Sequence, residues 1–313
     1  TATTESAATA YQRVVALAGA MPWRRDSNDQ RIARTVRQRQ PPHLDGRRVE
    51  DRDDDHGRQV VQDRERLAGY DRVCGFALRE EVPPTWLHVL TFPLQVHLLS
   101  DPASTIRLVG VVHVSNRMRR HRPVAAGERL DLSVRAANLR PHRRGVLVDL
   151  IGEARVSDTL VWDGVSTYLC PGAELDDPAP KAGDGQPAGQ QAGPKGPAFE
   201  ARDPLSTWRL PADLGLDYRR VSGDPNPIHT NRLAARAFGF SRPIIHGMWT
   251  HARLLAALEP RLPATYEVSV DFTKPILLPA TIGCWWQRDP DGWDAAVTTA
   301  DGAKPHLLAR ITP

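Results

Sequence analysis

Apolar and polar residues alternate along several stretches of the chain with the two-residue period that is typical of β-strands. The apolar residues that share one face in two such stretches are Val146, Val148 and Leu150, and Val268, Val270 and Phe272. From about residue 248 the period becomes that of a helix, one face of which carries Met248, Ala252, Leu255 and Leu258. The pattern therefore predicts long strands combined with helices.

This order of elements occurs twice. A helix-forming segment at 85–99 and another at 246–260 each precede several strands, with Pro-containing bends at 122–127 and 274–279. An antiparallel sheet with one apolar face needs a cover, and one helix per repeat supplies it. We therefore expect an α+β fold with two antiparallel sheets, each wrapped around a central helix. Pro93 argues against a long regular helix in the first repeat.

A segment rich in Pro, Gly, Ala and Gln separates the two repeats at residues 171–203. It has too few apolar residues to offset the entropy that ordering would cost. We expect residues 1–170 to form the first repeat, 171–203 a linker, and 204–313 the second repeat. The strongly charged segment 24–69 is not assigned to any element beyond a short strand.

Composition excludes some functional classes. Hydrophobic residues make up 41% of the chain and charged residues 25%, which is typical of a globular protein. The net charge of +4 comes from scattered arginines, which argues against a nucleic-acid partner but suits an anionic ligand. No apolar run reaches the roughly 18 residues that a membrane span needs. Three widely spaced cysteines, Cys74, Cys170 and Cys284, favour unpaired thiols in a cytoplasmic protein.

The segment 218–231, YRRVSGDPNPIHTN, carries the candidate chemistry. Its glycine and two prolines argue against a regular helix or strand, so it is expected to be a loop. A stiffened loop with Asp224 and His229 five residues apart suits an acid/base pair. Each residue alone has a simpler interpretation, since Asp224 could cap a helix near Asn231 and His229 could fill a polar turn. The combined string is more specific than its parts.

The string YxxxSGDxNPIH at 218–229, followed by PIIHGM at 243–248, resembles the hydratase motif of MaoC-like, R-specific hydratases and dehydratases. The resemblance extends over residues 70–170 and 204–312 to the family's actinobacterial two-repeat members. It implies a double hot-dog fold and reversible dehydration of (R)-3-hydroxyacyl thioesters to trans-2-enoyl thioesters. The implied substrate is carried on coenzyme A or on acyl carrier protein, and neither a metal nor another cofactor is implied.

The resemblance places Asp224 and His229 in the acid/base roles. The backbone N–H of Gly247, at the expected start of a helix, is the candidate for stabilising the enolate oxygen. Residues expected to orient the loop or the water are Ser222 and Asn226, and the supporting set is completed by Tyr218 and Gly223. His246 is interpreted as a capping or packing residue at the start of the helix.

The first repeat has no acid/base pair at the corresponding position, residues 70–76, so one active site per chain is expected. This repeat either opens room for a long acyl tail or only completes the fold and covers a sheet edge. Two other functions remain open: a hot-dog thioesterase, and a non-catalytic acyl-binding subunit. The chain could also form a homodimer.

Overall fold

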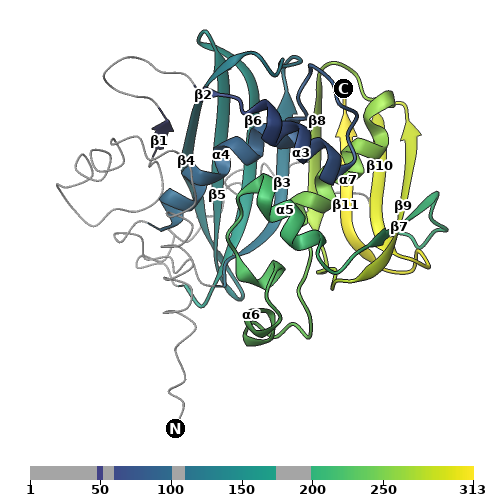
Figure 1. Cartoon of the computed structure of the whole chain (residues 1–313). Helices are drawn as coiled ribbons and strands as arrows, with labels where there is room; N and C mark the ends of the chain where they lie inside the picture. Colours follow the sequence, from purple (N-terminus) through teal and green to yellow (C-terminus); the bar gives the residue numbers. More distant parts are fainter. Residues whose placement is uncertain (1–47, 52–59, 101–109, 174–198) are drawn as a thin grey trace, which may run out of the picture.

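The computed structural model describes residues 48–51, 60–100, 110–173 and 199–313 (Figure 1). Most of the expected linker at 171–203 and much of the charged segment 24–69, including the strand expected within it, lie outside the described residues. The elements of the first half are β1 (Arg48–Asp51), β2 (Val60–Val61), α3 (Arg64–Cys74), α4 (Pro84–Leu99), β3 (Val112–Arg120), β4 (Arg129–His142), β5 (Gly145–Val156) and β6 (Thr159–Pro171). Those of the second half are β7 (Ser206–Leu210), α5 (Leu214–Ser222), the 3-10 helix η1 (Pro227–His229), α6 (Arg232–Ala237), α7 (Gly247–Leu258), the 3-10 helix η2 (Glu259–Arg261), β8 (Tyr266–Phe272), β9 (Ala280–Asp289), β10 (Gly292–Thr299) and β11 (Pro305–Thr312).

The strands form one continuous antiparallel sheet of 11 strands, with the path β1-β4-β5-β6-β3-β8-β11-β10-β9-β7 and β2 beside β4. The α+β fold is as expected, but the two expected sheets are joined into one. Residues 115–120 of β3 pair with residues 266–271 of β8 and join the halves. Each of these strands would otherwise leave an open edge with unpaired backbone groups, and their mutual pairing removes both edges.

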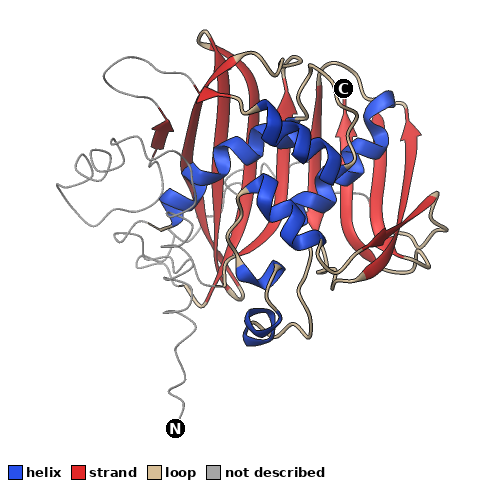
Figure 2. Cartoon of the chain, viewed as in Figure 1, coloured by secondary structure: helices blue, strands red, loops and turns tan. Residues whose placement is uncertain are grey.

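The expected order of a helix followed by strands does occur twice, and the strand path is symmetric about the β3–β8 pair. In Figure 2, helices lie across one face of both halves of the sheet. The correspondence extends to detail, because α3 and α5 both end at a left-handed glycine, Gly75 with φ 83° and Gly223 with φ 77°. A buried tyrosine, Tyr70 or Tyr218, lies five residues before each glycine.

The helix expected from the apolar pattern near Met248 is α7, and all four residues of its predicted face are buried. The helix of the first repeat corrects the sequence prediction, because α4 runs for 16 residues straight through Pro93. A proline removes only the one hydrogen bond that its N–H would make to residue 89. Buried Val89 before it and buried Leu98 and Leu99 after it pack both halves of the helix into the core, which offsets that loss.

The apolar faces predicted for the strands are also buried, with Val148, Leu150 and Val268 fully enclosed. All three cysteines are free and buried, as the sequence predicts. Among the helices in the described part of the chain, none is long and apolar enough to cross a membrane.

Candidate active site

The candidate motif begins in a helix. Residues 218–222 form the last turns of α5, so the expectation of a loop from residue 218 onward was wrong. Gly223 ends the helix in the left-handed region, which a residue with a side chain rarely adopts. The chain then turns into Asp224, whose backbone N–H donates to Oγ of Ser222 at 3.3 Å.

Two hydrogen bonds between residues two apart in the sequence stabilise the next turn. Oδ1 of Asp224 accepts the N–H of Asn226 at 2.9 Å, and Oδ1 of Asn226 accepts the N–H of Ile228 at 3.3 Å. The first bond orients the carboxyl group, and the second caps η1, whose last residue is His229. Helix α6 is capped by Asn231. The alternative interpretation of Asp224 as the cap of that helix is therefore wrong.

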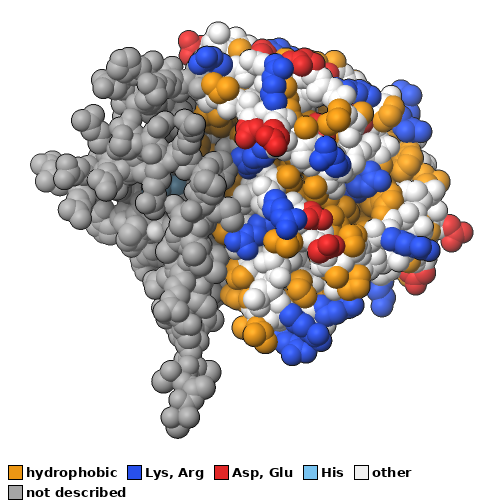
Figure 3. Space-filling view, viewed as in Figure 1, with side chains coloured by type: hydrophobic (Ala, Val, Ile, Leu, Met, Phe, Trp, Pro, Cys, Tyr) orange, Lys and Arg blue, Asp and Glu red, His pale blue; other side chains and the backbone are white. Residues whose placement is uncertain are grey.

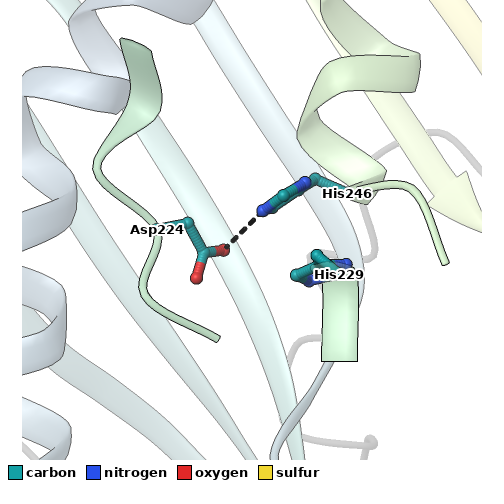
Figure 4. Close-up of side chains that lie close together, drawn as sticks. All are labelled: Asp224, His229 and His246. Carbon is teal, nitrogen blue, oxygen red and sulfur yellow. Dashed lines mark ion pairs between the residues drawn. The ribbon is translucent and has the colours of Figure 1, made fainter. Parts of the chain in front are cut away.

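The structure brings Asp224 and His229 together, and it adds His246 to them (Figure 4). The Nε2 atom of His246 lies 3.8 Å from Oδ2 of Asp224, and the rings of His229 and His246 stack with centroids 3.6 Å apart. Both imidazoles are buried, whereas the Asp224 side chain keeps 23% of its surface exposed. Solvent therefore reaches this cluster, the Asp-His-His trio, from the side of the carboxylate.

Sequence reasoning gave His246 a capping or packing role, and the structure shows no cap. His246 is the N-cap residue of α7, but its side chain accepts no hydrogen bond from the helix. Neither ring nitrogen has a hydrogen-bond partner among the described residues. The sequence does hold one signal that could have placed His246 in the site. His246 stands beside Gly247 at the expected start of a helix, within the motif at 243–248.

The tautomer of His229 follows from one contact. Its Nδ1 lies 2.8 Å from the carbonyl oxygen of Ile244, which can only accept, so Nδ1 carries the proton. Nε2 of the neutral ring is therefore unprotonated and free to accept a proton. The nitrogen and carboxylate atoms of the trio lie within 4.8 Å of one another. Groups about 4.6 Å apart can both bind one water, at ~2.8 Å each with a tetrahedral angle.

Burial moves the pKa values of Asp224 and His229 toward each other. It raises the pKa of Asp224 above 3.8, against the opposing effects of His229, the Asn226 N–H and Arg219. It also lowers the pKa of His229 below 6.5, against the opposing effects of Asp224 and the Ile244 carbonyl. Burial and the neighbouring His229 lower the pKa of His246 well below its usual range. A smaller difference between the two pKa values makes proton exchange between the carboxyl and imidazole groups easier.

Two imidazoles and a carboxylate are also a set of ligands that divalent metals accept. A tetrahedral zinc ion with bonds of about 2.1 Å would hold its ligand atoms roughly 3.4 Å apart. The 3.8 Å between His246 and Asp224 is wider than that. The geometry thus fits a shared water better than a metal ion, and the expectation of cofactor-free chemistry stays a prediction.

Gly247 lies beside the trio as the first residue of α7. Its backbone N–H has no acceptor among the described residues, as is usual for the first turn of a helix. A Cβ at this position would lie 3.0 Å from two ring carbons of Phe272. Glycine therefore suits this position because the start of the helix packs closely against the Phe272 side chain of β8.

Two further residues fix the positions of the histidines. The ring of Tyr218 lies 4.8 Å from that of His246, at an angle of 55°. Gly215 of α5 lies so close to η1 that a Cβ there would be 2.1 Å from the carbonyl oxygen of His229. The sequence predicts Tyr218 as a supporting residue but gives no signal for Gly215, because this contact depends on how α5 packs against η1.

Arg66 of α3, in the first half of the chain, binds the backbone that leads into the loop with Asp224. Its Nε donates to the carbonyl oxygen of Val221 at 2.7 Å, and a second guanidinium nitrogen donates to that of Ser222 at 3.1 Å. These carbonyls belong to the last turn of α5, where the helix leaves them unpaired. The guanidinium also lies over Trp86 of α4, 5.3 Å from the ring centroid. Arg66 thus joins the first repeat to the backbone that ends at Asp224.

We expect Arg66→Ala to lower kcat about tenfold or more, because a shift of the loop by a fraction of an ångström misplaces the carboxylate. Arg66→Lys should restore part of the loss, since an ammonium group can donate to one carbonyl but not to both. Arg64→Ala is the matched control, since Arg64 is exposed on the same helix. Steady-state kinetics with a short enoyl thioester measures all three. Equal kcat for Arg66→Ala and Arg64→Ala would contradict the positioning role.

The fold and the trio define a hot-dog-like α+β protein with an Asp/His site at the start of a central helix. A model described as "MaoC like domain" matches residues 192–294. The chain is 36% identical over 245 residues to 3-hydroxyacyl-thioester dehydratase X of Mycobacterium tuberculosis, covering 78% of this chain and 84% of that protein. The crystal structure of HtdX from the same organism superposes with a TM-score of 0.70, at 32% identity, over 85% of this chain and 99% of that one.

A second mycobacterial structure, described as having a double hot-dog fold, gives a TM-score of 0.52 at 18% identity, over 86% of this chain and 97% of that one. At this identity the two proteins share the fold. With the 36% identity above, these matches show that the chain belongs to the MaoC-like dehydratase family.

Proposed function

We propose that this protein is a hydro-lyase that reversibly dehydrates (R)-3-hydroxyacyl thioesters to trans-2-enoyl thioesters, within a double hot-dog fold. The observation that carries the proposal is the Asp-His-His trio beside a free helix N-terminus. Its acid/base groups can share one water, and the Gly247 N–H can bind a thioester oxygen. The name of the 36% identical relative supports the same reaction class.

In the dehydration direction each of these residues has a separate role. Nε2 of His229 accepts the α-proton, and the electron pair of that C–H bond forms the new double bond. The C–O bond to the β-hydroxyl breaks, and the departing oxygen takes a proton from Asp224, whose raised pKa favours the protonated acid. The Gly247 N–H donates to the thioester oxygen, where negative charge develops. Hydration is the reverse, with water between Asp224 and His229.

The direct test is hydration of crotonyl thioester, followed as loss of enoyl absorbance, with free thiol measured in the same reaction. We expect the absorbance to fall without thiol release, because the trio would act on the α- and β-carbons. Release of thiol at the rate of substrate loss would identify a thioesterase, which attacks the carbonyl. Binding of the thioester without either change would identify an acyl-binding subunit.

The expectation that the first repeat opens room for a long acyl tail stays a prediction, without the support of an interruption at Pro93, because α4 is continuous there. We propose that the first repeat, residues 1–170, also closes the edge of the catalytic half through β3 and holds the catalytic loop through Arg66. Residues 171–203 would then link it to the catalytic repeat at 204–313.

A further inference from the structure

Several arginines lie close to the residues of the trio along the chain, in a stretch that is poor in acids. The chain has no Asp or Glu between Asp224 and Glu259. Arg219 lies one turn before the catalytic loop, and the chain continues from His229 into α6, which carries Arg232 and Arg236. The arginine rim consists of Arg219, Arg232, Arg236 and Arg242. Figure 3 shows Lys and Arg side chains gathered along the lower edge of the molecule, where Figure 1 places α6.

The side chains of the rim are available to a ligand. Arg232, Arg236 and Arg242 are exposed, and none has an ion pair or a hydrogen bond to another described residue. Neighbouring Arg220 differs, because it pairs with Asp217 at 2.8 Å. Arg232 and Arg236 are four residues apart on α6 and therefore share one face of the helix. Exposed guanidinium groups without acidic partners favour binding of a multiply charged anion.

The rim is tied to the trio by short stretches of chain. Arg232 follows His229 by three residues, and Arg242 precedes His246 by four. A backbone hydrogen bond from Ile244 to Ile228, 3.2 Å long, holds these two stretches together. Arg219 acts electrostatically on both Asp224 and His246. The rim is therefore connected to the trio through a few residues of backbone on each side.

We propose that the arginine rim binds the phosphate groups of the thioester carrier. The protein would then recognise the carrier as well as the acyl group of the substrate. This rests on the proposed thioester function. Guanidinium groups pair with phosphate oxygens through two parallel hydrogen bonds, which suits Arg better than Lys. Coenzyme A and the phosphopantetheine arm of a carrier protein both present phosphate, and they differ in how many groups they carry.

The test compares Arg232→Gln/Arg236→Gln with the unsubstituted protein on two substrates, crotonyl-coenzyme A and the phosphate-free crotonyl N-acetylcysteamine thioester. We expect KM for the coenzyme A thioester to rise about fivefold to tenfold with little change in kcat, because each exposed pair contributes modestly. KM for the phosphate-free substrate should not change. The rise should shrink as salt screens the charges. Arg219 is left intact, since it acts on Asp224 directly.

The matched control is Arg129→Gln/Arg209→Gln, which removes the same charge from exposed positions on β4 and β7. Equal KM values for coenzyme A thioester in the rim variant and this control would overturn the proposal, as would an equal rise for both substrates. Crotonyl-phosphopantetheine identifies the source, since a full effect there points to the arm's phosphate and an effect with coenzyme A alone to its nucleotide phosphates. Failure of the proposed function is distinguishable, because neither substrate would then be hydrated by the unsubstituted protein.

Discussion

Asp224→Asn and His229→Gln should each lower kcat by about 10²–10⁴, the usual contribution of a positioned acid or base. Asparagine has the shape of aspartate, glutamine keeps a polar side chain in place of the imidazole ring, and neither amide exchanges protons as an acid or base. The double variant should lose little more than either single one, since the two groups act on the same water. Hydration of crotonyl thioester measures the loss.

Two controls separate chemistry from folding. Asp213→Asn makes the same change at an exposed position at the start of α5, where the side chain forms no cap. His97→Gln does so at an exposed histidine on α4. Both should retain the parent activity, and all variants should keep the parent melting temperature within a few degrees. Near-parental kcat in either Asp224→Asn or His229→Gln would remove the trio from the mechanism.

The second large effect is a loss of stability in acid, caused by histidines buried between the two repeats. His88 on α4 and His251 on α7 are almost fully buried, and His88 lies 6.1 Å from His113 of β3 between ring centroids. Burial lowers the pKa of His88 to about 4 and that of His251 to about 3, and it lowers the pKa of His113 well below 6.5. The rings of His88 and His251 are therefore mostly neutral in the folded protein at pH 5.

In the unfolded chain the same histidines bind protons once the pH falls below about 6.5. The unfolded state then holds more protons than the folded state, so the free energy of unfolding falls as the pH falls. Between pH 7 and pH 5, His88 and His251 should each remove about 2 kcal/mol from it. The decline should level off only where the folded protein itself binds the protons, near pH 4 for His88.

Urea unfolding at pH 7 and pH 5 measures this effect, and α4 offers a matched pair of variants. In His88→Leu the decrease in the free energy of unfolding from pH 7 to pH 5 should be smaller by about 2 kcal/mol, because the titrating group is gone. His97→Leu, on the exposed side of the same helix, should leave the loss unchanged. The comparison uses a difference between pH values, so it does not depend on how well leucine packs. An unchanged loss in His88→Leu would show that the buried ring is not responsible.

The sequence alone determined the features that depend on neighbours along the chain. Alternation with a period of two identified the buried faces of β5 and β8, and a period of 3.6 identified that of α7. Asp224 and His229 share one loop because five residues and two prolines leave little freedom between them. The repeat was visible because each half carries the same local pattern of helix, strands and bend.

Only the tertiary structure decided the contacts between distant segments. The pattern of β3 and β8 shows which face of each strand is buried, but not that their edges pair into one sheet. Pro93 by itself argues against a continuous helix, but packing of the residues on both sides of it keeps α4 helical through this position. His246 joins Asp224, and Arg66 reaches the end of α5 from 155 residues away. Such contacts depend on which surfaces meet when the repeats pack, and a local sequence pattern holds no information about that.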